Sequence, residues 1–480
     1  MRAKNQTTDP AAEAQPKASP AFLLWLVAIA FFMESLDTTI LNTAVPAIAG
    51  ALHVSPLSLK SVLASYMLSL AVFIPISGWM ADRFGTRTVF SSAIAVFTLG
   101  SLLCGLSTNL PMLVVFRILQ GCGGAMMVPV GRLIVVRAFP KSGLLQAMSF
   151  VGIPALIGPL LGPLAGGALV HYAHWRVIFF INIPIGLLGL ALVYRYLPEY
   201  RQELRTQLDA VGLVLFGGGI ALMSYVLEVF GEHTLSMTEI WCLLGLSVLL
   251  LGAYGSHAKR TEAPLLNASL FSVRTFRSAV SGSFLTRLGA GGVAFLLPML
   301  YQVGMGLTPV QSGLLLMPQA LMAMGLKVVV QKILARYSFR TVLSVNTVAL
   351  GVMIMLFATI SKSTSLGVVL TLSCMFGSLS SLQYSSLNSL VYSDIPPESS
   401  GGASSIASTA QQLSLSFGIA LASLLAATFV PRGMAATPAE IVEGVHRAFL
   451  VMGGLTILSV VSFFSLRKAD GASTMGLTAE

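Results

Sequence analysis

Charged residues are scarce in this chain. Only 10% of its 480 residues are charged, 55% are hydrophobic, and the mean hydropathy is +0.84. No soluble domain of this size tolerates so apolar a composition, so a polytopic membrane protein is predicted. Residues 1–20 lack the basic stretch, short apolar core and cleavage site of a signal peptide, so we expect them to remain as a disordered tail.

Residues typical of enzyme centres are also few. The four cysteines stand alone in or beside apolar stretches, with no CxxC pair and no histidine at ligand spacing, so we interpret them as small hydrophobic residues. The sequence has no Walker loop, no HExxH and no GxSxG motif. We therefore expect neither an enzyme nor a bound metal or cofactor.

Long apolar stretches fill most of the chain. Stretches of about 17 to 25 apolar residues can cross a bilayer as helices. Fourteen are found, near 22–44, 59–80, 89–107, 112–131, 144–170, 176–196, 210–229, 240–257, 278–302, 311–331, 341–360, 367–390, 403–430 and 446–466. They lack the short alternation of strands, and a transmembrane helix satisfies its own backbone groups, so the prediction is an all-α protein.

The basic residues give the orientation. With the amino terminus inside, 20 of the 28 Lys and Arg residues fall on cytoplasmic tails and loops. Both termini are therefore predicted to be cytoplasmic. The net charge of +10 is mostly this positive-inside signal, so no nucleic-acid partner is needed to explain it.

The chain divides into two halves around an insert. We predict a cytoplasmic tail at 1–20, a six-helix half at 21–196, a linker with two inserted helices at 197–258, a second six-helix half at 259–466 and a tail at 467–480. The segment Asp82–Arg87 has weak sequence similarity to Arg336–Arg340, which indicates an internal repeat. Two six-helix halves enclosing a central path are typical of a transporter that moves about a midplane site.

Two carboxylates lie one helical turn apart inside the first predicted span. An ionised acid in the membrane costs roughly 2.5 kcal/mol or more, so Glu34 and Asp37 point to function. Asp37 has Thr38, Thr39 and Asn42 as nearby polar residues and can exchange a proton as access alternates. The alternative for Asp37 is a structural ion pair with an arginine. Glu34 is open to three roles: a second proton site, a contact for a cation, or a structural partner.

Two arginines also lie within predicted spans. Arg117 is six residues past Pro111, so its side chain either snorkels to the interface or pairs with an acid of the first span. Arg287 is near the centre of its span. Its side chain is either a structural counter-ion or a contact for a substrate anion. These arginines balance Glu34 and Asp37, so the spans hold no net negative charge to attract a cation.

Polar helix faces suggest a wet cavity. We place Glu34, Asn42, Arg287, Gln383 and Gln412 in it. Helix packing explains the polar residues around Gln383 and Gln412 equally well.

Several motifs carry a family resemblance. They are LDTTILNTAVP at 36–46, GWMADRFGTR at 78–87, RILQG at 117–121, GPLLGPLAGG at 158–167 and WRVIFFINIPIG at 175–186. With these motifs the chain resembles the major facilitator superfamily, specifically its fourteen-helix drug:proton antiporters. The match is strong over the first six predicted helices and looser beyond them.

The resemblance implies roles for several motif residues. The loop at 78–87 is implied to be a conformational latch formed by Gly78, Asp82, Arg83, Gly85 and Arg87. The alternative is that the basic residues of this loop only set the orientation of the chain in the membrane. The helix at 144–170 is implied to seal an antiporter against proton leak. The alternative is that the motif residues of this helix serve only tight packing against other helices. These residues are Gly152, Gly158, Pro159, Gly162, Pro163, Gly166 and Gly167. The resemblance also implies that Arg117 tunes an acid of the first helix.

The expected function is export of a small organic molecule through the bacterial inner membrane. Protons are the expected counter-substrate, with Asp37 as the main carrier, and the proton gradient is the energy source because no ATP motif is present. We expect a monomer in contact with lipid. The first alternative is export of an organic anion or a metal–carboxylate chelate. The second is a receptor or scaffold on the same fold that transports nothing.

Overall fold

The computed structural model describes residues 20–139, 141–200, 207–230, 236–396, 399–428, 437–467 and 470. All regular structure in these residues is helical, which confirms the all-α prediction. The predicted tails at 1–20 and 467–480 lie outside the described residues, apart from Pro20, Arg467 and Asp470.

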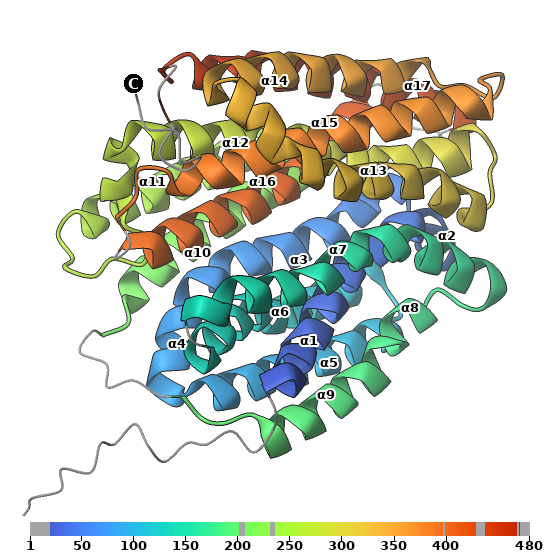
Figure 1. Cartoon of the computed structure of the whole chain (residues 1–480). Coiled ribbons are helices and arrows are strands. Elements are labelled where there is room, and N and C mark those ends of the chain that lie inside the picture. The colour runs from blue at the N-terminus through green and yellow to red at the C-terminus, as the bar shows by residue number, and fades with distance from the viewer. Residues whose placement is uncertain are drawn as a thin grey trace, which may run out of the picture.

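The first half of the chain forms a bundle whose helices run side by side (Figure 1). Its long helices are α1 (Pro20–Ile40), α3 (Lys60–Phe73), α5 (Thr86–Leu106), α6 (Leu110–Ala138), α7 (Lys141–Tyr172) and α9 (Asn182–Tyr196). Shorter helices are α2 (Val45–Ala51), α4 (Ser77–Phe84) and α8 (Val177–Phe180). The helix α4 continues α3 through a 3-10 turn at Ile74–Ile76, so the two form one membrane span.

The second bundle lies beside the first (Figure 1). It consists of α12 (Arg274–Met299), α13 (Pro309–Arg336), α14 (Phe339–Leu356), α15 (Leu366–Tyr392), α16 (Ser400–Thr428) and α17 (Pro438–Leu458). Between the bundles in sequence are α10 (Ala210–Phe230) and α11 (Met237–Ala258), which pack mainly on each other, with α10 against α3 and α16. The predicted arrangement of two six-helix halves plus an inserted pair is therefore confirmed.

Thirteen helical segments among the described residues are long and apolar enough to span a membrane. Thirteen of the fourteen predicted spans correspond to them. The remaining prediction, 311–331, corresponds to α13, a 28-residue helix that is not among the thirteen and that carries Gln319 and Lys327. It packs between α7 and α15, as the other helices of the bundle pack on their neighbours.

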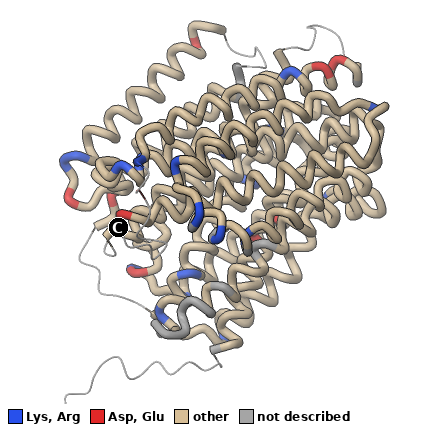
Figure 2. The backbone as a smooth tube through the Cα atoms, turned by 45° about the horizontal axis from the view of Figure 1, so that its top comes forward, with Lys and Arg blue, Asp and Glu red and all other residues tan. Residues whose placement is uncertain are grey.

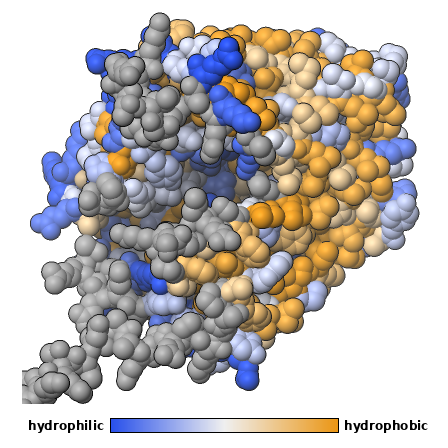
Figure 3. Space-filling view, viewed as in Figure 1, coloured by the Kyte–Doolittle hydropathy of each residue, from blue (hydrophilic) through white to orange (hydrophobic). Residues whose placement is uncertain are grey.

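Basic residues mark one end of the bundle. Arg83, Arg137, Arg195 and Arg336 lie in the last turns of α4, α6, α9 and α13. Lys and Arg residues gather along this side of the bundle (Figure 2). We call it the basic end and the other the opposite end. A broad apolar surface covers the middle of the helices, and hydrophilic residues gather at its edge (Figure 3).

The two halves share a large hydrophobic core toward the opposite end, and a smaller cluster that includes the inserted helices joins Ala71 of α3 to Leu413 of α16. The large core contains Ile40 and Leu63 of the first half together with Phe295 and Phe449 of the second. Toward the basic end each half has its own large cluster of buried residues. Hydrogen bonds across the shared region join Ser416 Oγ to the Ala64 carbonyl at 3.0 Å and Ser423 Oγ to the Leu57 carbonyl at 2.9 Å. The halves are thus fastened together toward the opposite end.

Candidate functional site

Asp37 and Arg117 form a buried ion pair. Asp37 lies on α1, Arg117 on α6, and each residue is 1% exposed. The Arg117 Nη1 atom donates to Asp37 Oδ2 at 2.6 Å. Glycines such as Gly121 and Gly124 let α6 approach α3 closely, because a Cβ atom at either position would lie within 3.0 Å of an atom of Ser69 or Tyr66. The structure therefore gives Asp37 the arginine partner that the sequence left as an alternative.

Two amides complete the surroundings of the Asp37 carboxylate. Gln120 Nε2 donates to Asp37 Oδ1 at 2.9 Å, and Asn182 Nδ2 donates to the same oxygen at 3.0 Å. The Gln120 carbonyl oxygen also accepts from Arg117 at 2.8 Å. Ser101 Oγ accepts from the Asn182 amide at 3.1 Å. Four helices, α1, α5, α6 and α9, thus meet at one carboxylate.

The other face of Arg117 is covered by an aromatic ring. The Tyr66 ring of α3 lies over the guanidinium group, with 4.2 Å between Arg117 Cζ and the ring centroid. Arg117 Nε is 3.4 Å from the Val62 carbonyl oxygen. This arrangement satisfies the charge of Arg117 with a carboxylate, an amide, a carbonyl and a π face, as a charge removed from water requires.

The predicted polar neighbours of Asp37 lie elsewhere. The Thr38 hydroxyl donates to the Ser35 carbonyl at 2.8 Å, and the Thr39 hydroxyl lies 3.1 Å from the same carbonyl. Asn42 is partly exposed in the 3-10 turn that follows α1. The true partners, Gln120 and Asn182, are inside the motifs at 117–121 and 175–186. The spacing of three residues between Arg117 and Gln120 was the one local signal for the first of them.

Glu34 lies one turn from Asp37 toward the basic end of α1. It is partly exposed, and no hydrogen bond joins its carboxylate to another described residue. Arg132 of α6 is close enough to act on it electrostatically. The two acids of α1 therefore occupy different environments: Asp37 is enclosed and Glu34 is accessible.

Arg287 has no acidic partner among the described residues. Its Nε atom donates to Ser283 Oγ at 3.2 Å, and its Cζ atom lies 4.0 Å from the centroid of the Tyr384 ring. The side chain is partly exposed. The Tyr384 hydroxyl is buried and has no hydrogen-bond partner within the described part of the chain. This corner of the second half therefore holds an uncompensated cation beside an unpaired hydroxyl.

The two glutamines placed in the cavity from sequence differ in position. Gln383 is fully buried: its carbonyl oxygen accepts from Asn346 at 2.9 Å, and its amide donates to Thr347 at 2.7 Å. These bonds hold α15 to α14, so Gln383 packs helices here and we leave it out of the cavity. Gln412 on α16 is partly exposed.

The loop at 78–87 is held by ion pairs at the basic end. Asp82 pairs with Arg137 of α6, and Arg87 lies 3.6 Å from Glu199. Arg83 is exposed. The partner of the Asp82 carboxylate is thus an arginine side chain of α6.

Glycines of this loop differ in what they do. Gly85 has a φ of +91°, and a Cβ atom there would meet Glu199 Oε1 at 2.1 Å, so only glycine fits. A Cβ atom on Gly78 would meet nothing within 4 Å, so no close approach of a neighbouring helix requires glycine at this position.

The helix α7 packs between α1 and α13. Gly158, Gly162 and Gly166 face α1, where added Cβ atoms would lie within 2.5 Å of Ser35, Thr39 and Ile40 atoms. Gly167 faces the second half, where its Cβ atom would lie 2.3 Å from the Pro309 carbonyl oxygen. The Thr43 hydroxyl donates to the Pro163 carbonyl at 3.2 Å. Pro159 and Pro163 lie within the helix, and a Cβ atom on Gly152 would meet nothing within 4 Å.

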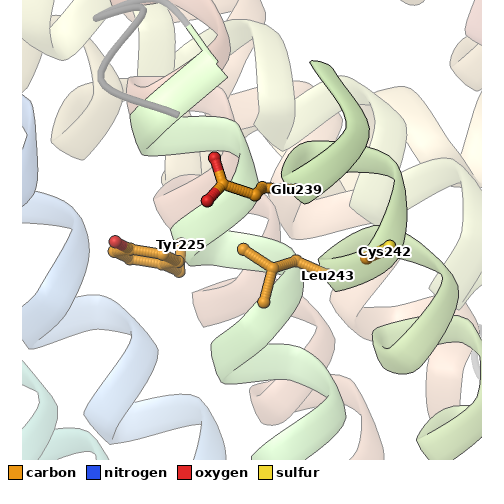
Figure 4. A pocket seen from close by; sticks show the side chains of 4 residues that line it. All are labelled: Tyr225, Glu239, Cys242 and Leu243. Carbon is orange, nitrogen blue, oxygen red and sulfur yellow. The ribbon is translucent and has the colours of Figure 1, made fainter. Parts of the chain in front are cut away.

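A shallow pocket lies on the inserted pair, between α10 and α11 (Figure 4). It is lined by Tyr225, Glu239, Cys242 and Leu243. The Glu239 carboxylate already accepts from the Ser236 backbone and hydroxyl. The pocket therefore offers no free charge and is not the candidate site.

The chain matches the family model described as Major Facilitator Superfamily over residues 27–419. A relative from Pectobacterium atrosepticum named "Putative multidrug resistance protein MdtD" is 39% identical over 451 residues, which cover 94% of this chain and 94% of the relative. One of the same name from Escherichia coli O7:K1 is 41% identical over 411 residues, covering 86% and 87%.

Solved structures of low sequence identity share the fold. A D-xylose-proton symporter superposes with a TM-score of 0.67 at 15% identity, covering 94% of this chain and 99% of its own. A POT family transporter in complex with 5-aminolevulinic acid gives a TM-score of 0.68 at 15% identity, covering 93% and 95%. The common architecture extends over both bundles, including the helices that hold Asp37 and Arg117.

Proposed function

The chain belongs to the major facilitator superfamily and is a multi-pass membrane transporter rather than an enzyme, and we propose that it exports a small organic molecule in exchange for protons. The membrane it crosses is then the bacterial inner membrane, and the direction is out of the cytoplasm. The relatives are named as multidrug resistance proteins, which favours a drug-like compound as the cargo.

The enclosed ion pair of Asp37 with Arg117 carries this proposal. Two charges removed from water each cost several kcal/mol, and only their mutual attraction and hydrogen bonds offset that cost. A proton added to the Asp37 carboxylate removes one charge and leaves Arg117 buried without its anion. In other buried pairs, loss of one partner destabilises by roughly 3–5 kcal/mol, which is enough to shift a conformational equilibrium.

The arrangement of the two halves supports an inward-facing conformation. If the basic end is cytoplasmic, as the positive-inside pattern predicts, the shared core closes the outer side. Asp37 is then ionised and paired while the transporter is open to the cytoplasm. Export would proceed by substrate entry from this side, reorientation of the halves, and protonation of Asp37 from the outer side as the substrate leaves.

Substrate export from everted membrane vesicles tests the role of Asp37. We expect wild-type uptake of a cationic dye such as ethidium, or of an organic acid, to depend on the imposed pH gradient. Asp37→Asn keeps the shape of the side chain but cannot ionise, so it should abolish that dependence. Transport by Asp37→Asn with an unchanged pH profile would exclude Asp37 as the proton carrier, and absence of any flux in proteoliposomes would favour a receptor instead.

Arg287 favours a second candidate function, export of an organic anion or a metal–carboxylate chelate. Its guanidinium group is partly exposed, lacks an acidic partner among the described residues, and stacks on Tyr384. A guanidinium group binds carboxylates through paired hydrogen bonds. The two candidates share the proton step at Asp37 and differ only in the charge of the cargo.

A further inference from the structure

Tyr66 lies between the enclosed ion pair and the accessible carboxylate. Its side chain is fully buried, and its ring covers the Arg117 guanidinium group at 4.2 Å. Arg117 in turn holds Asp37 at 2.6 Å. The tyrosine ring is therefore held against the arginine that pairs with the proposed proton carrier.

The hydroxyl of Tyr66 points along α6 toward the basic end. A Cβ atom added to Gly124 would lie 2.7 Å from the Tyr66 hydroxyl oxygen, and Gly124 is two helical turns beyond Arg117 in that direction. Glu34 is one turn beyond Asp37 in the same direction along α1. The tyrosine thus extends from the level of Asp37 to the level of Glu34.

This hydroxyl has no hydrogen-bond partner within the described residues. An unpaired buried hydroxyl costs about 1–3 kcal/mol, so a side chain that only packed against Arg117 would be expected as phenylalanine. A group that can donate and accept a proton therefore lies beside the ion pair of Asp37 and extends toward the level of Glu34.

We propose that Tyr66 relays protons between Asp37 and Glu34. The Asp37 carboxyl gives its proton to the Tyr66 oxygen while the Tyr66 hydroxyl gives its own proton to the Glu34 carboxylate. The net change is transfer of one proton from Asp37 to Glu34, which releases it to water, and Tyr66 is unchanged. This inference rests on the proposed function, because it takes Asp37 as the proton carrier.

The structure shows the relay interrupted. Asp37 is bound to Arg117, Gln120 and Asn182, and no hydrogen bond joins the tyrosine to Asp37 or Glu34. A continuous chain of hydrogen bonds would let protons leak without substrate. Arg132 acts on Glu34 from α6, and Cys104 lies 3.7 Å from Gln120 beside the ion pair, so these are the other titratable or charged groups of the site.

Infrared spectroscopy after a rapid pH change tests the relay on the purified full chain. Carboxyl bands are assigned to Glu34 and Asp37 by their loss in Glu34→Gln and Asp37→Asn. In the wild type we expect the Glu34 signal to change first and the Asp37 signal to follow. Tyr66→Phe removes only the hydroxyl, so it should slow the Asp37 signal at least tenfold and leave the Glu34 signal unchanged.

Two further variants guard against a folding artefact. Gly124→Ala keeps the hydroxyl but displaces it, and it should also slow the Asp37 signal. Tyr301→Phe is the matched control, because Tyr301 is fully buried in the second half and its hydroxyl lies 3.4 Å from Ser373. Unchanged Asp37 kinetics in both Tyr66→Phe and Gly124→Ala would overturn the relay. A wild-type Asp37 that never takes up a proton would overturn the proposed function as well.

Discussion

Two arginines within the membrane are distinguished by their partners. Arg117 is enclosed and paired with Asp37, whereas Arg287 is partly exposed and contacts only a serine and a tyrosine ring among the described residues. A charge that is satisfied internally holds a structure together, and one that is not is available to a ligand. The two arginines therefore occupy different environments in the two halves.

Substitution of Arg287 tests whether the cargo is anionic. Arg287→Ala should reduce transport of an organic acid by at least tenfold and leave a neutral or cationic substrate transported, because only the anion loses its counter-charge. Arg287→Lys keeps the charge but loses the paired donors, so partial activity is expected. Vesicle uptake of both substrate classes measures this, and equal losses for all substrates would indicate a structural role.

Single residues also show what sequence can reveal about the site. Asp37 and Arg117 could be identified as charges in apolar spans without any structure. Their pairing, and the contacts of Gln120 and Asn182, join positions 80 to 145 residues apart in sequence, and no local spacing encodes these contacts. Tyr66 gave no signal, because a tyrosine in an apolar span is ordinary.

The helix α7 is the element most closely bound to α1. A methyl group on Gly166 would lie 2.1 Å from the Ile40 backbone carbonyl, which cannot move aside as a side chain can. The glycine pattern of α7 was predicted to make a close-packing face, and Gly158, Gly162 and Gly166 do face α1. A Cβ atom on Gly152, about two turns before Gly158, would meet nothing within 4 Å. Spacing alone could not separate the crowded positions from the open one.

Gly166→Ala and Gly152→Ala make a matched pair for this helix. The first should lower the melting temperature in detergent and the transport rate, because overpacking typically costs about 1–3 kcal/mol. The second should be neutral or slightly stabilising, since alanine favours a helix by roughly 1 kcal/mol over glycine. Equal behaviour of the two variants would mean that α1 and α7 are not in tight contact.

A carboxylate before α10 helps to tie the inserted helices to the segment that leads into the second half. Asp209 precedes α10 and accepts from His257 at 2.7 Å, the Gly212 N–H at 2.7 Å and the Leu265 N–H at 3.0 Å. Burial opposes ionisation of Asp209, but these hydrogen bonds outweigh it and hold its pKa below the usual value. The tie therefore stabilises the protein above the unfolded pKa of about 3.9 and is lost as the pH falls through the lower, folded-state pKa.

Melting temperatures measured from pH 7 down to pH 3 test this tie. Asp209→Asn should melt below the wild type at neutral pH, and the difference should shrink only at the acid end of the range. Glu262→Gln, an exposed carboxylate in the same region, serves as the control and should match the wild type throughout. A difference that is constant down to pH 3 would show that ionised Asp209 does not contribute.

For the whole molecule, composition and apolar stretches were enough to predict two six-helix halves and an inserted pair. The conformation was not predictable, because either end of such a bundle can close with the same helices. Among the described residues, the large core shared by the halves lies toward the opposite end, a small cluster joins α3 and α16 beside the inserted pair, and the large clusters toward the basic end belong to one half each. Under the proposed function, with the basic end in the cytoplasm, we infer that this state is open to the inside while Asp37 is paired with Arg117.

We propose that this molecule couples substrate movement to protons through Asp37. Simultaneous recording of substrate and proton fluxes in proteoliposomes tests this coupling, with a substrate found by screening cationic drugs and organic acids. We expect that substrate added on one side drives protons the opposite way in the wild type, and that Asp37→Asn loses the proton flux. Substrate flux without proton movement in the wild type, or proton coupling that survives in Asp37→Asn, would contradict it.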